Sequence, residues 1–118
     1  MRLLEENPPM GPIYDILRRL GITANYVGFF YASYGVWLCT KQPERLLLVT
    51  KWLYPDIASH YGTNWKTVER DLRTVVAIAW RNNPTLLETL AGKPLHEKPC
   101  SAQFFSILAA GIFPKGVA

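Results

Sequence analysis

The chain has 118 residues, of which 49% are hydrophobic and 19% charged, so its composition excludes a disordered chain and fits a single globular domain. The formal net charge of +4 permits a phosphate-binding face without requiring one. Two distant cysteines without CxxC spacing argue against a disulfide framework, and the start of the chain does not resemble a signal peptide. No stretch is long and apolar enough to span a bilayer, so the cytoplasm is the expected location.

The chain is expected to open with a leader and a first helix. Within the leader at residues 1–12, the proline-rich stretch 7–12 predicts a stiff, extended chain, with Pro12 at the first position of the helix that follows. Gly21 is expected to end this helix as a left-handed cap. The apolar side chains of its inner face are Ile13, Ile16, Leu17 and Leu20.

An aromatic-rich segment at residues 26–40 predicts the second helix, with Thr23 as its N-terminal cap. Aromatic residues also favour strands, so a strand is the competing interpretation. The segment is longer than a typical strand and its apolar positions do not alternate, which favours the helix. Gly28 and Gly35 lower its helix propensity, but they would allow another helix to approach closely.

The remainder of the chain predicts further helices separated by turns rich in glycine, proline and asparagine. These helices span residues 45–53, 55–61, 65–81, 85–90 and 101–110. In the first of them the inward stripe is expected to be Leu46, Leu47, Val49 and Leu53. In the last, Ser101 is the expected cap and Gly111 the expected end. No segment demands a β-strand, so the predicted fold class is all-α, a compact bundle of about six helices.

The fourth and fifth predicted helices, with the turn between them, have the spacing of a helix-turn-helix. Ala58 provides a small residue where the helices cross, and Gly62 provides a turn position that can adopt positive φ. Val68 is the aliphatic residue expected to be buried early in the second helix. Asp71 stands where this motif usually has an apolar residue, and Leu72 is expected to take the buried role. Two residues of the first motif helix are expected to complete the apolar pocket between the two helices: Ile57 and Tyr61.

The second helix of this motif has one apolar and one polar face. Its inner face is formed by Val68, Leu72, Val75, Val76 and Ala79. The polar side carries the candidate DNA-contacting residues Lys66, Thr67, Glu69, Arg70, Arg73 and Thr74. An arginine can grip guanine O6 and N7 with two hydrogen bonds, and a glutamate can accept one from cytosine N4. The alternative interpretation is a solvated surface on which Glu69 and Arg73 form an ion pair.

Two short motifs in this region are distinctive: Tyr-Pro-Asp-Ile-Ala at residues 54–58 and Val-Glu-Arg at residues 68–70. With the flanking stretches 16–22, 28–31, 79–80 and 98–105, they resemble the DNA-binding effector domain of the stage-zero sporulation response regulator family. The resemblance covers about residues 13–111.

This resemblance implies a compact bundle of about six helices that contains a helix-turn-helix. It implies that Glu69 and Arg70 contact base edges, and that Arg73 corresponds to the arginine that follows this pair in the family. It implies double-stranded DNA as the partner, with head-to-tail pairing on tandem sites and contact with RNA polymerase. The expected division is a leader at 1–12, a DNA-binding domain at 13–113 with its motif at about 54–81, and a tail at 114–118.

The sequence departs from the family pattern at five positions of the second motif helix, of which Trp65 and Lys66 replace smaller residues at its start. The family has an arginine, an alanine and a histidine where this chain has Thr67, Asp71 and Thr74. Losing one cation and gaining one anion should weaken the attraction to phosphates and alter the preferred operator. The family regulator also carries a receiver domain, for which the dozen or so residues before the first helix leave no room. The chain is therefore either an excised domain or a free-standing relative.

Metal sites, cofactors and catalysis are not predicted. His60 and His96 have no cysteine or acidic residue at metal-binding spacing, so both are expected at the surface. No catalytic constellation is visible, so an enzyme is not expected. The leading hypothesis is a sequence-specific DNA-binding transcription regulator. The alternative is a protein-interaction module on the same fold without base readout, which Glu69, Asp71 and the lost arginine favour.

Overall fold

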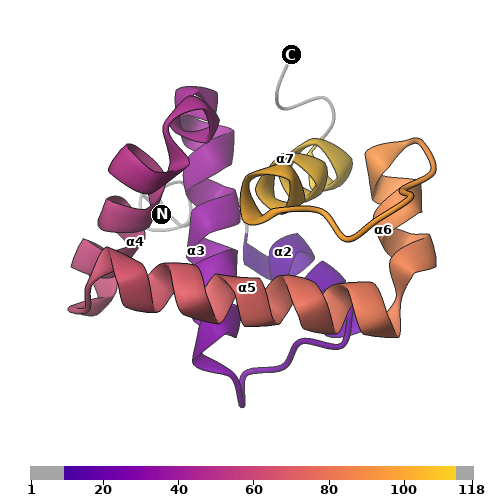
Figure 1. Cartoon of the computed structure of the whole chain (residues 1–118), viewed down its shortest axis with the longest axis horizontal. Coiled ribbons are helices and arrows are strands. Elements are labelled where there is room, and N and C mark those ends of the chain that lie inside the picture. Colours follow the sequence, from indigo (N-terminus) through magenta and orange to yellow (C-terminus); the bar gives the residue numbers. More distant parts are fainter. Residues whose placement is uncertain (1–9, 114–118) are drawn as a thin grey trace, which may run out of the picture.

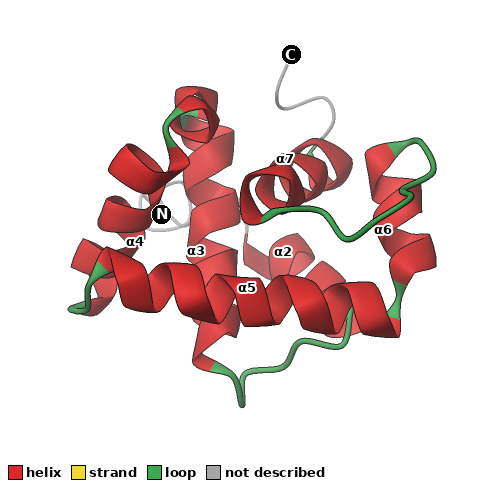
Figure 2. Cartoon of the chain, viewed as in Figure 1, coloured by secondary structure: helices red, strands yellow, loops and turns green. Residues whose placement is uncertain are grey.

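The computed structural model describes residues 10–113, and every secondary-structure element within that range is helical (Figure 2). The α-helices are α2 (Met10–Arg19), α3 (Val27–Lys41), α4 (Tyr54–Tyr61), α5 (Trp65–Asn82), α6 (Pro84–Ala91) and α7 (Ser101–Ile112). A short 3-10 helix, η1 (Pro43–Leu47), and a short π-helix, η2 (Val49–Leu53), lie between α3 and α4. The described part of the chain confirms the predicted all-α bundle and the helical interpretation of residues 26–40.

Helix α3 passes through the middle of the bundle, and α5 runs across it (Figure 1). Two glycines on α3 make its close helix contacts possible, because they carry no Cβ. A Cβ on Gly28 would lie 3.0 Å from the backbone oxygen of Asp71 in α5. A Cβ on Gly35 would lie 2.5 Å from Cε1 of Phe105 in α7. The expectation that these glycines admit neighbouring helices is confirmed.

The interior is filled by aliphatic and aromatic side chains from all parts of the described chain, and their burial is the main term that favours folding. The largest fully buried side chains are Phe104, Phe105, Ile13, Leu17, Leu20, Ile22, Leu53, Ile57, Leu72, Leu87, Leu108 and Val36. Because Leu72 of α5 belongs to this core, the core determines which face of α5 points outward.

The predicted start of the first helix and the predicted cap of the second are wrong. Helix α2 begins at Met10, so Pro12 lies in its first turn, where a missing N–H costs no helical hydrogen bond. The extended leader is therefore wrong for residues 10–12, and its remainder lies outside the described residues. Thr23 does not cap α3: its carbonyl accepts the Tyr26 N–H at 3.1 Å in a turn, and the helix starts after Tyr26. Gly21 has the predicted left-handed conformation, with φ 91°.

The last helix also differs from its prediction at both ends. Ser101 is the first residue of α7, and Cys100 occupies the cap position without a side-chain hydrogen bond. Gly111 does not end α7, which continues to Ile112. A Cβ on Gly111 would lie 2.7 Å from Cδ2 of Leu90, so this glycine allows α6 to pack closely against α7.

The inward stripe predicted for residues 45–53 is wrong at Leu47, which is 81% exposed. The chain leaves helical geometry at Leu48, with φ −137° and ψ 62°, so the segment is two short pieces instead of one helix. A 3-10 turn has fewer residues per turn than an α-helix and a π turn has more, so a stripe of α-helical period loses its register. The other predicted members are buried or half-buried: Leu53, Leu46 and Val49.

An ion pair ties this segment to the first helix of the motif. Arg45 Nε donates to Asp56 Oδ2 of α4 at 2.9 Å, and the Arg45 side chain is only 13% exposed. The guanidinium also lies 5.3 Å from the centroid of the Trp52 ring. The Asp56 side chain is 39% exposed, so this charge-assisted bond is partly shielded from water and helps to hold α4 in place.

Candidate nucleic-acid interface

Helices α4 and α5 are joined by the short turn that the sequence predicts. Gly62 follows α4 with φ 68° and ψ 37°, a left-handed conformation that glycine adopts without steric cost. At the junction, Ala58 is 4% exposed and Val68 is fully buried. The turn and the buried junction agree with the spacing argument and are consistent with a helix-turn-helix.

Tyr61 does not complete the pocket between these helices, contrary to prediction. It is 40% exposed, and its hydroxyl donates to the backbone oxygen of Phe30 at 3.2 Å. Its ring lies 5.4 Å from the ring of Tyr31. Because α3 passes beside the end of α4, the tyrosine finds its partners on α3 instead of α5. Ile57 is fully buried, as predicted.

Asn64 sets the start of α5. Its backbone is extended, and its Oδ1 accepts the Thr67 N–H at 2.9 Å, which satisfies one of the free donors at the helix N-terminus. Leu72 is fully buried while Asp71 is half-buried, so Leu72 takes the role expected of it. The predicted inner face is confirmed, since no member is more than 2% exposed: Val68, Leu72, Val75, Val76 and Ala79.

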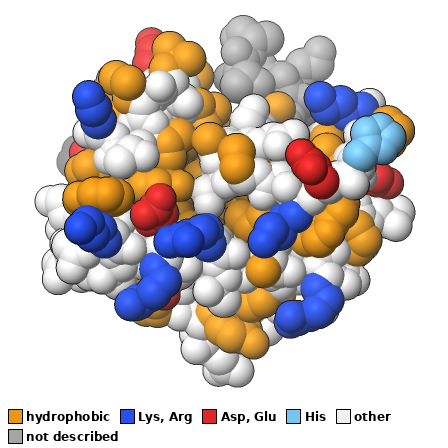
Figure 3. Space-filling view, in the orientation of Figure 1, with side chains coloured by type: hydrophobic (Ala, Val, Ile, Leu, Met, Phe, Trp, Pro, Cys, Tyr) orange, Lys and Arg blue, Asp and Glu red, His pale blue; other side chains and the backbone are white. Residues whose placement is uncertain are grey.

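The candidate DNA-contacting residues all lie on α5 but differ in exposure. Thr67 and Glu69 are half-buried at the sides of the helix. The exposed members are Lys66, Arg70, Arg73 and Thr74. The three cations are spaced by four and three residues, so they fall on one side of the helix. Lys and Arg side chains accordingly form a band across the face that α5 crosses (Figure 3).

Two carboxylates of α5 pair with its arginines. Arg70 Nε lies 3.2 Å from Asp71 Oδ1, and Arg73 Nη2 lies 4.0 Å from Glu69 Oε1. The arginine side chains are 68% and 69% exposed, so water screens both pairs strongly. Exposed pairs of this kind contribute at most about 1 kcal/mol, so both guanidinium groups remain available to a stronger partner.

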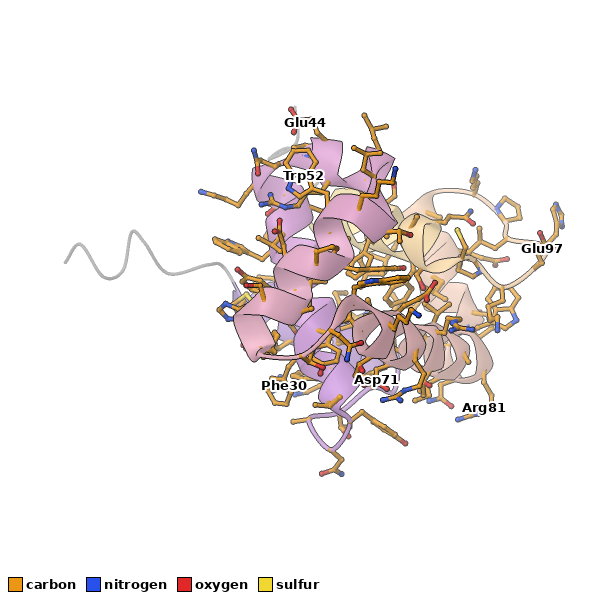
Figure 4. All side chains as sticks on the ribbon, turned by 60° about the vertical axis from the view of Figure 1, so that its left-hand side comes forward. Phe30, Glu44, Trp52, Asp71, Arg81 and Glu97 are labelled. Atoms are coloured by element: carbon orange, nitrogen blue, oxygen red, sulfur yellow. The ribbon has the colours of Figure 1, made fainter. Side chains whose placement is uncertain are left out.

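The cationic side of α5 extends beyond the residues that the sequence pattern singled out. Arg81 is exposed and lies eleven residues after Arg70, which is close to three helical turns and places it on the same side. Figure 4 shows Arg81 well separated from Asp71 along α5. The eleven-residue spacing is the signal that could have identified Arg81 from the sequence.

A cavity of about 430 Å³ opens beside α5. It is lined by Val49, Thr50, Tyr54, Glu69, Arg73, Val76, Lys98, Pro99, Cys100, Ser101 and Ala102. Burial raises the pKa of the Tyr54 hydroxyl, which lines this cavity. Glu69 and Arg73 thus belong both to the candidate DNA-contacting set and to the cavity wall, and the sequence had not indicated this second environment.

The histidines and cysteines lie as expected for surface and core residues. His60 and His96 are exposed, and the His60 ring stacks on that of Tyr34 with centroids 4.0 Å apart. Cys39 is buried, which raises the pKa of its thiol to about 12, whereas Cys100 is exposed. Among residues 10–113, no three or more His, Cys, Asp or Glu side chains are grouped to hold a metal ion. No helix in that range is long and apolar enough to cross a membrane.

A family model covers nearly all of the described chain. The model described as sporulation initiation factor Spo0A C terminal matches residues 13–112, from α2 to the end of α7. The match confirms the resemblance carried by residues 54–58 and 68–70. The family is one of DNA-binding domains that regulate transcription in sporulation, and it is not an enzyme family. This chain therefore belongs to the family of the Spo0A C-terminal DNA-binding effector domain.

Proposed function

We propose that the chain is a sequence-specific DNA-binding regulator of transcription whose helix α5 enters the major groove. The two-sided character of α5 carries this proposal. One side is closed into the core, and Lys66, Arg70 and Arg73 project from the other. An α-helix with its side chains is about 10–12 Å wide, which fits a major groove of about 12 Å.

Arg70 is the residue expected to contribute most to base recognition. It projects from the outermost part of α5 and is 68% exposed, with Asp71 as a partner on the surface. Exchanging that partner for water or DNA costs at most about 1 kcal/mol. A bidentate arginine–guanine contact supplies about 1–3 kcal/mol of discrimination, so the base is the stronger partner.

The remaining members of the set have complementary roles. Glu69 offers an acceptor for the exocyclic amine of cytosine once Arg73 turns away from it. The two side chains are only loosely paired, since Arg73 Nη2 lies 4.0 Å from Glu69 Oε1. Lys66 stands in the first turn of α5, where recognition helices approach base edges and phosphates. Thr67 and Thr74 are short side chains that can contact a thymine methyl group or a phosphate.

A protein-interaction module without base readout is the second candidate function. The observation in its favour is that each of two arginines on α5 already has a carboxylate neighbour, Asp71 for Arg70 and Glu69 for Arg73. The family arginine is also replaced by Thr67. A chain that had lost DNA readout would bind no duplex tightly even at low salt.

Selection of bound duplexes from a random pool, followed by titration at several salt concentrations, tests the proposal. We expect a preferred sequence and an affinity that falls steeply with salt. Arg70→Ala should reduce the ratio of preferred to scrambled duplex affinity by about 5- to 150-fold, which corresponds to about 1–3 kcal/mol. Arg81→Ala is the matched control for this ratio: it removes an exposed arginine from the far end of the same helix, so any loss of affinity should be equal for both duplexes. Absence of binding to any duplex at low salt would favour the interaction module.

The proposal extends to the partners that the family resemblance implies. Two copies would bind tandem sites head to tail and contact RNA polymerase in the cytoplasm. Cooperative binding to duplexes with two sites, compared with one site, tests the pairing. Non-cooperative binding at every spacing between the sites would exclude it.

A further inference from the structure

We propose that the cavity beside α5 receives a backbone phosphate of the bound DNA, held jointly by Arg73 and Lys98. Arg73 then positions the recognition helix in the groove and does not read a base. This inference rests on the proposed function, because it assumes that α5 lies in the major groove. It adds Lys98 to the interface and moves Arg73, and with it Glu69 of the same cavity wall, from base reading to the side of the groove.

The charges around the cavity suit an anion. Arg73 contributes one cation from α5, and Lys98 contributes a second from the loop that precedes α7. Glu69 is the single acidic residue in the lining and lies 4.0 Å from Arg73, leaving the wall with a net positive charge. Within residues 10–113, Lys98 has no ion-pair partner. A phosphate entering the cavity would therefore meet one weakly paired cation and one without a pair.

The helical position of Arg73 favours a phosphate over a base. Successive residues of an α-helix are about 100° apart, so Arg73 is rotated about 60° from Arg70 around the axis of α5. The rotation is toward Glu69 and Val76, the two other α5 residues in the cavity wall. A helix in the major groove presents its outermost line to base edges and its sides to the sugar-phosphate walls. Arg73 therefore lies toward a wall of the groove.

Lys98 is held on that same side by its surroundings. Earlier in the loop, the Leu95 N–H donates to Glu88 Oε2 of α6 at 2.9 Å. After Lys98, Pro99 is buried, and α7 begins at Ser101. These anchors on both sides restrict the loop, so less conformational entropy is lost when the lysine meets a phosphate. The apolar lining, including Val49 and Pro99, suits the adjacent deoxyribose.

Lys93 provides a matched control within the same loop. It is an exposed cation like Lys98, but it lines a separate recess with Leu90 of α6 and Gln103 of α7. That recess has no lining residue from α5. Replacing Lys93 therefore removes the same unit of charge without touching the proposed phosphate site.

The test measures affinity for the preferred and a scrambled duplex, over a range of salt, for the wild type and four variants of the whole chain: Arg73→Ala, Lys98→Ala, their double variant and Lys93→Ala. Each of the first two should weaken binding to both duplexes equally, by about 3- to 10-fold at low salt, leaving their ratio unchanged. The double variant should lose less than the product of the two single losses. For the double variant, the slope of log affinity against log salt concentration should become shallower by about 0.9, the value for one phosphate. A change of about 1.8 is the value for two phosphates.

Three results would overturn the inference while leaving the proposed function intact. Unchanged binding by Lys98→Ala, or a loss equal to that of Lys93→Ala, would remove Lys98 from the interface. A changed preferred-to-scrambled ratio in Arg73→Ala would make Arg73 a base-reading residue. Strictly multiplicative losses would mean that the two cations hold different phosphates. If the wild type binds no duplex, the proposed function and this inference fail together. Circular dichroism melting of each variant checks that folding is unchanged.

Discussion

Replacing Gly28 with alanine should destabilise the protein, although alanine is the better helix former. Gly28 is the second residue of α3 and lies where this helix crosses α5. The new Cβ would lie 2.6 Å from Val75 Cγ2 and 3.0 Å from the backbone oxygen of Asp71. Neither neighbour moves easily, because valine in a helix has one strongly preferred rotamer and the oxygen belongs to the backbone of α5.

The expected magnitude comes from two opposing terms. Alanine gains up to about 1 kcal/mol over glycine in a helix, and less near a helix end. Overpacking a close contact of this kind costs about 1–3 kcal/mol. The net loss in the free energy of unfolding is therefore about 1–2 kcal/mol. For a domain of 118 residues this corresponds to a Tm lower by about 4–8 °C.

Thermal and urea unfolding of Gly28→Ala and Gly11→Ala measure this difference. Gly11 is the second residue of α2, and a Cβ there would meet nothing within 4 Å, so only the propensity term acts. Gly11→Ala should be neutral or slightly stabilising. Adding Gly28→Ala to a Val75→Ala background should cost less than in the wild type, because the nearest clash is removed. A Gly28→Ala variant that melts at or above the wild-type Tm would refute the reasoning.

Three further predictions concern the cap of α5, the reactivity of the two thiols and the pH dependence of stability. Asn64→Ala should lower the free energy of unfolding by about 1 kcal/mol in urea, because the Thr67 N–H loses its acceptor, whereas Asn64→Ser should keep most of the stability; equal losses in both would argue against the cap. In the folded protein at pH 8, a thiol reagent should modify exposed Cys100 rapidly and buried Cys39 only on unfolding. Because folding raises the pKa of Cys39 from 9.0 to about 12, its contribution to stability is complete below pH 9 and declines as the pH rises toward 12. Rapid modification of both thiols would contradict the burial of Cys39.

The position of α5 and its two faces could be predicted from the sequence because their signals are local. A turn glycine and an apolar stripe of helical period both lie within residues 62–79, and the structure adds Asn64 as the cap of α5. The polar side of α5 followed from the same period, and its exposed cations lie where the period places them. Residue-by-residue roles in DNA contact remain predictions.

Predictions failed where a residue's environment depends on distant parts of the chain. The motif spacing predicts Tyr61 at the junction with α5, but α3 offers it Phe30 and Tyr31 as partners. A regular helix would point Leu47 inward, but helical geometry breaks at Leu48. Local periodicity carries no information about the contacts that α3 offers to Tyr61 or about the break in helical geometry at Leu48.

The sequence by itself determined that the chain is helical, where α5 begins and which of its faces is apolar, because hydrogen-bonded turns and side-chain periodicity are properties of neighbouring residues. The tertiary structure alone decided that Lys98 shares a cavity with Arg73 and that Gly28 lies against α5. These juxtapositions arise from the packing of α3, α6 and α7 around the core. They depend on the shape of all the buried side chains together, and no local pattern in the chain records that shape.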